Sequence, residues 1–511
     1  MWGKTDRGPQ GVTSWLPLHQ HLADAAGVAG LLVDEWLSPQ VISRIARDLP
    51  DGAADTRTLA VWLAAVHDVG KASPAFLIQD LHLADLATRH GRRVDPRLGG
   101  DPLRGVVNHA LVGHVAVQDW LLDDLGFGRR GPARQLAAIV GSHHGVPPES
   151  HQLTTVRERG DLAGTGPWIT ARQEILGWAA ELVGGVDALR RFADVSLSLP
   201  AQTLLTAVVI VADWIASNDH LFPLFPLHTA DGALWTPDAA GDDRRLCEGW
   251  RRLGLPGAWR PAATSDVGVD DLLTARFGRM TGARPVQRAA LDMARSPTAP
   301  GLMIVEAPMG EGKTEAALLA VEAIAARTGA DGCFVALPTR ATSDAMFTRV
   351  LTWVEALPRA GESVSVTLAH GTANLNDAFT GLSSSGRLQS VGTDTGGDVA
   401  IAHAWLRGRK KGVLAQMVVG TVDQVLFAGL KSRHLMLRHL GLAGKVVVID
   451  EVHAYDVYMS QYLERVLHWL GAYAVPVILA RTRDQHGRAR VDQLLRAVLP
   501  LEVACQPQPH E

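Results

Sequence analysis

The stretch that decides the fold is Met303-Ile304-Val305-Glu306-Ala307-Pro308-Met309-Gly310-Glu311-Gly312-Lys313-Thr314-Glu315. A short apolar run leads into a turn that contains Gly310 and Gly312, and a helical pattern follows. Such a turn directs backbone N–H groups and a helix N-terminus at phosphates. We expect Lys313 to reach the β- and γ-phosphates of a nucleoside triphosphate and Thr314 to bind Mg²⁺. A chance Gly-Lys-Thr at a helix start is the alternative.

A second element downstream supports the nucleotide site. The apolar run 446–449 ends in Asp450-Glu451-Val452-His453. Together with the glycine-containing turn, this pattern predicts Asp450 beside the Mg²⁺ and Glu451 beside the attacking water. By itself, an acidic pair after a strand is most often a solvated strand end.

The spacing of apolar residues changes along the chain. Residues 14–220 look helical throughout, and no segment of this half alternates like a strand. Residues 221–271 are rich in proline and glycine and indicate a linker with one short helix near 243–253. Beyond them, apolar runs alternate with helical patterns, which predicts a parallel sheet covered on both faces. The runs are 302–307, 332–337, 364–369, 416–420, 446–449 and 475–480.

Composition limits the choice of partners and compartment. The 511 residues include 49 basic and 53 acidic ones, with a net charge of −4, so a nucleic acid would need a local basic groove. Three cysteines lie far apart, which argues against a disulfide framework and fits a reducing cytoplasm. The N-terminus lacks an apolar signal core, and the apolar stretch 204–216 is shorter than the roughly 20 residues that span a bilayer. We therefore expect a cytoplasmic protein without a membrane partner.

The first half carries a separate set of chemical groups. His67-Asp68 stands at a predicted helix end, and further candidate ligands lie on other helical segments: His21, His109, His143, His144 and Asp213. Imidazole and carboxylate together suit Mn, Fe, Ni, Co or Zn. Several histidines with a bridging carboxylate suit two metals, which activate water for phosphoryl displacement. Unconnected histidines are the alternative, and spacing does not exclude His19, His114 or His151.

These motifs resemble a known family. His67-Asp68-Val69-Gly70-Lys71, with 18–22 and 212–218, looks like an HD-type nuclease domain. The second half resembles a superfamily-two helicase in Arg284-Pro285-Val286-Gln287 and in 307–314, 337–342, 405–412, 420–424 and 450–453. The combination resembles the CRISPR-associated helicase-nuclease of type I systems, which is recruited by the Cascade surveillance complex with its guide RNA.

The resemblance implies a fold and an activity. The fold would be an all-α HD domain over 14–220, a linker over 221–271 and an α/β RecA-like lobe with a parallel sheet over 272–511. The activity would be metal-dependent cleavage of single-stranded DNA in antiviral defence, with ATP and Mg²⁺ bound by the lobe. Two divalent transition metals, Mn, Fe, Co or Ni, would occupy the HD site.

It also implies residue roles. One metal would be held by His21, His67, Asp68 and Asp213, and the other by Asp68, His109, His143 and His144. Lys71 would contact phosphate near the metals and Gln287 would read adenine. The DNA backbone would be held by Thr339, Arg340 and Thr421. The basic cluster 407–411, with Arg407, Arg409 and Lys410, could track phosphates; a solvated loop is its alternative.

The resemblance has one large departure. After 475–480 this family has a Ser-Ala-Thr motif and then a second lobe, but here the run is followed by Arg481-Thr482-Arg483-Asp484. Without a second lobe and its arginine finger, we expect the chain alone not to unwind DNA. It would be a fragment, a split protein whose second lobe is a separate chain, or a degenerate product. Two other functions stay open: a nucleotide phosphohydrolase with the P-loop as sensor, and a remnant that only docks on the complex.

Overall fold

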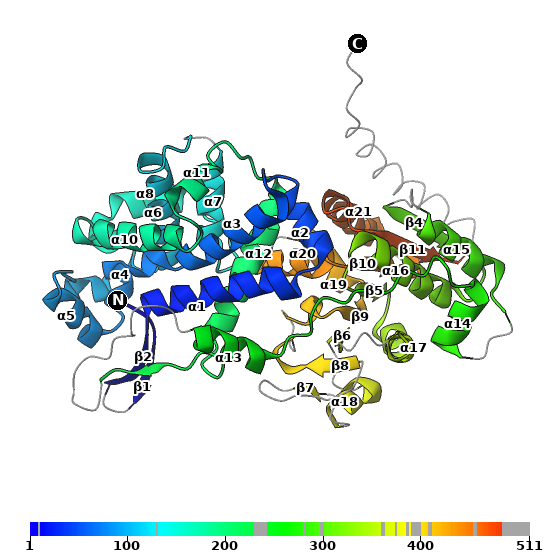
Figure 1. Ribbon diagram of the computed structural model, residues 1–511. Coiled ribbons are helices and arrows are strands. Elements are labelled where there is room, and N and C mark those ends of the chain that lie inside the picture. Colours follow the sequence, from blue (N-terminus) through cyan, green and yellow to red (C-terminus); the bar gives the residue numbers. More distant parts are fainter. Residues whose placement is uncertain are drawn as a thin grey trace, which may run out of the picture. The chain divides into compact units, whose positions relative to one another are not determined.

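The computed structural model describes residues 1–8, 11–128, 131–228, 243–278, 282–296, 301–358, 363–371, 373, 376–384, 388–389, 400–406, 411–430, 432–452 and 457–482. Arg407, Arg409, Lys410 and His453 lie outside the described residues. The chain divides into two compact units (Figure 1). The first comprises 1–35 and 45–253, and the second comprises 36–44 and the chain from 254 onward.

The first unit is mainly helical, as the sequence predicted. Its central helix α1 packs against α3 and α12, and α6 packs against α7. The helices are α1 Leu18–Leu31, η1 Leu32–Trp36, α3 Gly52–Val66, η2 Val69–Lys71, α4 Pro74–Leu77, α5 Leu81–Arg89, η3 Pro96–Gly100, α6 His109–Asp123, α7 Pro132–Gly141, α8 Ser150–Glu158, α9 Gly160–Ala163, α10 Pro167–Glu181, α11 Val186–Arg190, α12 Leu199–Ala216 and α13 Asp243–Leu253.

Helix α12 is the most apolar helix of this unit. It has 18 residues, because it begins at Leu199, five residues before the apolar run that the sequence marked. By length and composition alone it could cross a membrane, yet 67% of it is buried inside the protein. Burial of this extent is typical of the core helix of a compact domain, and α12 also carries Asp213.

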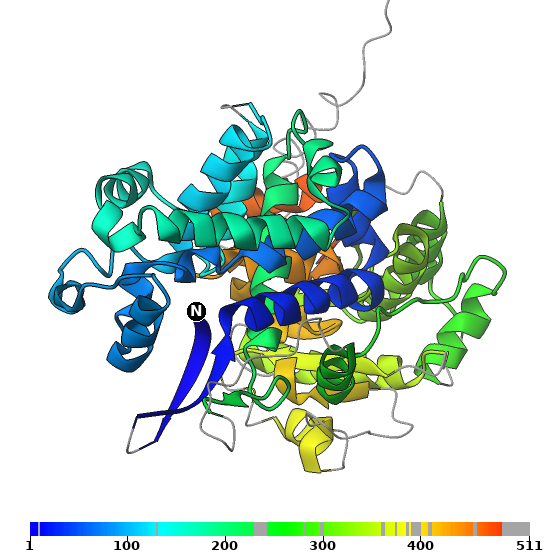
Figure 2. The same ribbon diagram turned by 60° about the vertical axis from the view of Figure 1, so that its left-hand side comes forward.

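A small antiparallel sheet stands before α1. Strands β1 (Trp2–Gly8) and β2 (Gly11–Pro17) form a hairpin, visible in dark blue in Figure 2, and β3 (Phe225–Pro226) pairs with β2. The expectation of a helical pattern from residue 14 onward is therefore wrong for 14–17, which belong to β2, whereas β1 and β3 lie outside that stretch. The buried apolar side chains of β1 and β2, Trp2, Trp15 and Leu16, cluster at the strand ends instead of alternating, so the period-two signal is missing.

The proline-rich stretch 221–271 contributes to both units. The helix expected near 243–253 is α13, and its Arg245 forms an ion pair of 3.0 Å with the buried Asp24 of α1. Residues from 254 onward belong to the second unit, where α14 (Val269–Phe277) begins within the same stretch.

The second unit contains a parallel sheet with strand order β4-β11-β10-β5-β9-β6-β8-β7. All six strands expected from the sequence are present, as β4 Leu302–Glu306, β5 Cys333–Leu337, β6 Val364–Ala369, β9 Met417–Thr421, β10 Val446–Ile449 and β11 Val477–Arg481. Two short strands, β7 (Leu388–Gln389) and β8 (Ala400–His403), extend the edge beyond β6. Every residue of β5, β9 and β10 is buried, so both faces of the sheet are covered.

The helices of the second unit surround this sheet. They are α14, α15 Pro285–Arg295, α16 Lys313–Thr328, α17 Arg340–Glu355, α18 Asp377–Ser384, η5 Ala404–Leu406, η6 Gly412–Leu414, α19 Asp423–Leu426, η7 Phe427–Gly429, α20 Leu435–Ala443 and α21 Val457–Ala472. A buried ion pair joins two of them: the Arg276 guanidinium of α14 donates to both carboxylate oxygens of Glu322 on α16, at 2.9 and 2.7 Å.

One segment of the second unit comes from far away in the sequence. Residues 36–44, at the start of α2 (Pro39–Ala46), reach the ends of three helices of the lobe. The Gln40 backbone N–H donates to Gly329 O after α16, and its side-chain amide donates to Ala443 O at the end of α20. The Arg44 guanidinium donates to Ala472 O at the end of α21. These bonds satisfy carbonyls that a helix end leaves unpaired.

The pair Arg276–Glu322 tests how far the lobe depends on a buried charge. Glu322→Ala should lower the free energy of unfolding by about 3–5 kcal/mol, because Arg276 is left buried without its carboxylate. Asp34→Ala, which breaks the exposed pair with Arg57, is the control and should cost at most about 1 kcal/mol. Calorimetric unfolding of the full chain measures both, and equal effects would contradict this account.

Candidate functional site

Side chains from five segments of the first unit converge on the buried carboxylate of Asp68. Its Oδ2 lies 3.1 Å from His21 Nε2 and 3.2 Å from His67 Nε2. Its Oδ1 lies 3.3 Å from His109 Nε2 and 3.4 Å from His143 Nε2. The two oxygens of one carboxylate therefore face two different pairs of imidazoles.

The side chains around Asp68 that could bind a metal fall into two groups. His21, His67, Asp68 and Asp213 form one, and His109, His143 and His144 form the other, each with candidate ligand atoms within 4.8 Å of one another. The structure thus brings together all seven side chains that the sequence marked as metal ligands. His19, His114 and His151 belong to neither group.

Helix ends explain how neighbours in sequence reach one centre. Helix α3 ends at Val66, and the backbone departs from helical geometry at Asp68, with φ −105° and ψ 14°, so His67 and Asp68 both reach the cluster. Likewise α7 ends at Gly141, and the adjacent His143 and His144 approach each other with ring centroids 4.2 Å apart. Within a regular helix, adjacent side chains would diverge by about 100°.

The imidazoles are prepared to bind a cation. The Nδ1–H groups of His67 and His143 donate to Ala64 O and Val140 O, both at 2.7 Å. This fixes the tautomer and leaves Nε2 as the free ligand atom. Both Nε2 atoms and Asp68 Oδ1 are buried without a hydrogen-bond partner. Buried polar atoms are rarely left this way, so the residues fit a pair of divalent metals.

The electrostatics of the two groups differ. Burial opposes protonation of His67, but the carboxylates of Asp68 and Asp213 outweigh it and raise its pKa to about 10. Positive charge is therefore favoured in the first group, and a metal ion would displace this proton. Burial lowers the pKa of His109 well below its usual value and that of His144 to about 4. His109 and His144 are consequently neutral imidazoles near neutral pH.

Lys71 and Gly70 complete the motif around Asp68. The Lys71 ammonium lies 2.6 Å from Asp68 Oδ2 and donates to Gly3 O at 2.9 Å, so it holds the carboxylate in place. Its expected contact with phosphate stays a prediction. Gly70 allows η2 to touch α6: a Cβ here would lie 2.0 Å from His109 O and 2.4 Å from Gly113 N. The sequence motif contained this glycine, but only the packing shows its role.

The phosphate-binding turn of the second unit has the expected form. Gly310 and Gly312 have φ of 82° and 76°, which favours glycine, and α16 begins at Lys313. Lys313 Nζ donates to Ala307 O and Pro308 O at 2.8 and 3.0 Å. Lys313, Thr314 and Asp450 line one small cavity, so the structure gathers the groups expected around a Mg²⁺–nucleotide.

The acidic pair after β10 is under electrostatic and conformational strain. Burial and the neighbouring Glu451 raise the pKa of Asp450, while Lys313 and Arg349 oppose that rise. Glu451 has φ of 54°, a conformation that a residue with a side chain rarely adopts. Arg349 of α17 also donates to Thr314 Oγ1 at 3.1 Å. No sequence motif marked Arg349.

Gln287 is placed against the turn. Its side chain is fully buried, and its amide accepts from Arg284 N at 2.9 Å and donates to Gly312 O at 3.3 Å. The amide thus supports the phosphate-binding turn in this structure. Its expected recognition of adenine stays a prediction.

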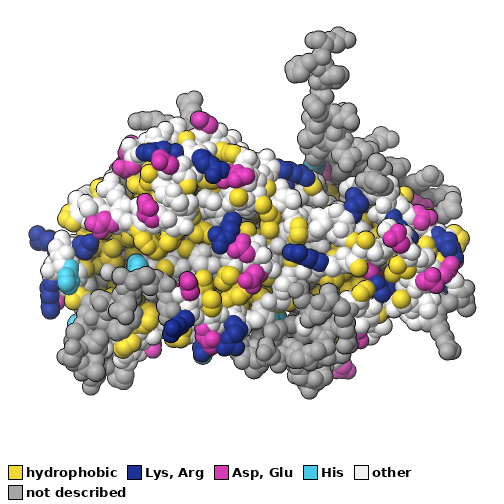
Figure 3. Space-filling model, in the orientation of Figure 1, with side chains coloured by type: hydrophobic (Ala, Val, Ile, Leu, Met, Phe, Trp, Pro, Cys, Tyr) yellow, Lys and Arg dark blue, Asp and Glu magenta, His cyan; other side chains and the backbone are white. Residues whose placement is uncertain are grey.

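The residues expected to hold DNA lie at the carboxyl ends of neighbouring strands. Thr339 and Arg340 follow β5 and are exposed, and Thr339 also caps α17 through a hydrogen bond from Thr342 N. Thr421 ends β9, pairs with Leu337 of β5 and is largely buried. In Figure 3, acidic and basic side chains are interspersed on the visible face.

Comparisons with known proteins match both parts of the chain. The Cas3 HD domain model matches residues 2–222, and the DEAD/DEAH box helicase model matches residues 284–480. The chain is 35% identical over 491 residues to the CRISPR-associated nuclease/helicase Cas3 of Streptococcus thermophilus, covering 91% of this chain and 50% of that protein. For the Cas3 endonuclease/helicase of Thermus thermophilus the identity is 35% over 464 residues, covering 89% and 47%.

Solved structures give the same result. The crystal structure of T. fusca Cas3 with AMPPNP has a TM-score of 0.76 and 29% identity, covering all of this chain and 53% of that one. A chain of a CRISPR RNA-guided surveillance complex, pre-nicking, has a TM-score of 0.65 and 28% identity, covering 100% and 50%. This chain therefore spans about half the length of the curated relatives it matches.

An HD domain followed by a DEAD/DEAH box helicase domain defines a nuclease/helicase architecture. The sequence, both sites and the solved structures agree on a single family. The chain carries both domains and is homologous to the CRISPR-associated Cas3 nuclease/helicases over about half of their length.

The close approach at Gly70 gives a test of the metal centre. Gly70→Ala should lower the metal content of the protein at least tenfold, because its Cβ would collide with the backbone of α6 and displace His109. Gly177→Ala, whose Cβ would meet nothing within 4 Å, is the matched control. Elemental analysis after dialysis measures bound metal, and wild-type metal content in Gly70→Ala would contradict the packing argument.

Proposed function

We propose that the first unit is a metal-dependent nuclease that cleaves single-stranded DNA, and that Asp68 bridges two divalent transition metals. The observation that carries this proposal is the division of Asp68: Oδ1 faces His109 and His143, and Oδ2 faces His21 and His67. Bound metals of this kind supply an activated water and stabilise the oxygens of a phosphoryl displacement. Mn, Fe, Co and Ni suit the imidazole and carboxylate ligands.

The protein's own residues prepare that chemistry. Ala64 O and Val140 O orient the imidazoles of His67 and His143. Lys71 holds Asp68 Oδ2 and, with His67, keeps the pKa of Asp68 well below its usual value even though burial would raise it. Asp68 is therefore ionised and available to both groups at neutral pH.

We further propose that the second unit binds ATP with Mg²⁺ through Gly310, Gly312, Lys313, Thr314 and Asp450, with Glu451 positioning water. T. fusca Cas3 has been crystallised with AMPPNP, ADP and ATP, which supports this nucleotide. Thr339, Arg340 and Thr421 would hold the DNA backbone.

The biological setting is part of the same proposal. We infer that the chain acts in the cytoplasm on DNA presented by a guide-RNA-containing Cascade surveillance complex. A relative in a CRISPR RNA-guided surveillance complex supports this partner. Unwinding would need further helicase structure, as the relatives are about twice as long. Such structure would come from the same protein or from a separate chain.

The metal site is tested by Asp68→Ala. Cleavage of single-stranded DNA with Mn²⁺, Co²⁺ or Ni²⁺ should fall below about 1% of wild type, because even groups that only orient metal ligands contribute about 10–100-fold. Asp95→Ala removes a partly exposed carboxylate of the same unit and is the control. Nuclease assays and elemental analysis measure cleavage and bound metal. Wild-type cleavage and full metal content in Asp68→Ala would contradict the bridging role of Asp68. Free nucleotides as substrates distinguish a nuclease from a nucleotide phosphohydrolase.

The nucleotide site should be separable from the nuclease. Lys313→Ala should weaken ATP binding by about 10–100-fold, since hydrogen bonds to charged groups contribute about 1.5–3 kcal/mol. Metal-dependent nicking of single-stranded DNA should stay within twofold of wild type, because the HD ligands lie in the other unit. Arg327→Ala, an exposed charge on the same helix, is the control. Titration with a fluorescent ATP analogue and a nicking assay on one preparation measure both; parallel loss would show that the ATP site controls cleavage.

A further inference from the structure

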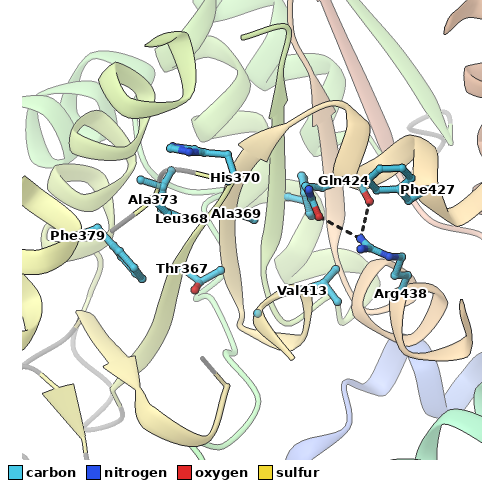
Figure 4. A pocket seen from close by; sticks show the side chains of 13 residues that line it. Thr367, Leu368, Ala369, His370, Ala373, Phe379, Val413, Gln424, Phe427 and Arg438 are labelled. Atoms are coloured by element: carbon cyan, nitrogen blue, oxygen red, sulfur yellow. Dashed lines mark hydrogen bonds between the residues drawn. The ribbon is translucent and has the colours of Figure 1, made fainter. Parts of the chain in front are cut away.

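A second cavity of the helicase lobe lies apart from the phosphate-binding turn. It has a volume of about 820 Å³, which is large enough for a nucleotide. Its walls come from the end of β6 and the following turn, and from α18, α19, η7 and α20 (Figure 4). Lys313, Thr314 and Asp450 do not line it.

The cavity adjoins the residues that are proposed to hold DNA. Gln424 lies on α19, three residues after Thr421. Across the cavity, the Arg340 guanidinium comes within 3.6 Å of the place where a Cβ on the lining residue Gly371 would stand. A strand held by Arg340 and Thr421 would therefore pass the mouth of this cavity.

One wall carries the cation Arg438, which forms no ion pair with a carboxylate of the described residues. Arg438 donates from Nη1 to the backbone O and the Oε1 of Gln424, both at 3.2 Å, as the dashed lines in Figure 4 show. Within the described ranges, no carboxylate lies within ion-pair distance of Arg438. A partly buried guanidinium that meets only neutral acceptors favours an anionic ligand.

The same wall offers an aromatic surface. The Arg438 guanidinium lies 5.2 Å from the ring centroid of Phe427, and Phe427 is still 40% exposed. An exposed aromatic ring is a platform for a nucleobase, and the Gln424 amide can bond to base edges. The opposite wall combines the apolar side chains of Phe379 and Ala373 with the polar ones of His370 and Thr367 (Figure 4). An anion site, a stacking surface and an amide together match one nucleotide.

We propose that this cavity takes one nucleotide unit of the single strand, with its base against Phe427 and its phosphate at Arg438. The proposal rests on the proposed binding of single-stranded DNA by this lobe and adds a base-binding site to it. Stacking on a ring is tolerant of sequence, so the site would hold any passing base.

The test uses the full chain, EDTA to prevent cleavage, and a fluorescent 20-nucleotide strand without secondary structure. Phe427→Ala should weaken binding about tenfold, as expected for loss of one stacked base. Phe427→Trp should restore wild-type affinity, and unchanged unfolding midpoints show that the variants are folded. Arg288→Gln, an exposed arginine paired with Asp270, is the control and should have no effect.

A strand of abasic sites distinguishes binding through the base from binding through the backbone. On this strand Phe427→Ala should bind as the wild type does, whereas Arg438→Gln should still bind more weakly and with a smaller salt dependence. Equal losses by Phe427→Ala on both strands would overturn base binding, and so would no loss on either.

Two further experiments identify the molecule that binds in the cavity and show which of the two proposals fails. A free deoxynucleoside monophosphate that binds in a Phe427-dependent manner, while the strand is insensitive to Phe427, would overturn the proposal in favour of a free nucleotide. If Arg340→Ala weakens strand binding but the Phe427 and Arg438 variants do not, the cavity proposal fails and the proposed DNA-binding function stands. If the wild type does not bind the strand at all, both fail.

Discussion

The metal-ligand cluster of the first unit is built around one buried charge, the carboxylate of Asp68. A carboxylate that is taken out of water needs compensating partners, and Asp68 has Lys71 on one oxygen and imidazoles around both. Each partner comes from a different turn or helix, so the helices must be arranged around this point. The partners that the buried carboxylate of Asp68 needs thus determine how these helices meet at the cluster and which side chains it contains.

The acidic pair of the second unit is in a different electrostatic environment. There the acids Asp450 and Glu451 stand beside each other, and their mutual repulsion and burial disfavour the ionised form of Asp450. Lys313 and Arg349 reduce that repulsion but do not remove it. The two units therefore differ: the surrounding side chains favour the ionised form of Asp68, whereas burial and the neighbouring Glu451 disfavour that of Asp450.

Sequence patterns predicted the elements whose signal is local. The six strands of the sheet are continuous apolar runs because helices cover both faces, and the phosphate-binding turn is marked by its own glycines. The histidines could be chosen by residue type, and helix ends supply the geometry that spacing could not. Strands β7 and β8 are too short for a pattern, and β1 and β2 do not alternate. The roles of Arg349 and Gly70 arise from contacts between separate elements, which no local pattern encodes.

The segment 36–44 has a consequence for how the protein is made. Arg44 bonds to a carbonyl 428 residues further along the chain. At roughly 5–20 residues per second, a ribosome needs roughly 20–90 s to deliver that partner. During this interval Val41, which is buried in the finished protein near Gly444, has no surface to pack against. The N-terminal part of the chain therefore leaves the ribosome before the carbonyls that Gln40 and Arg44 bond to have been made.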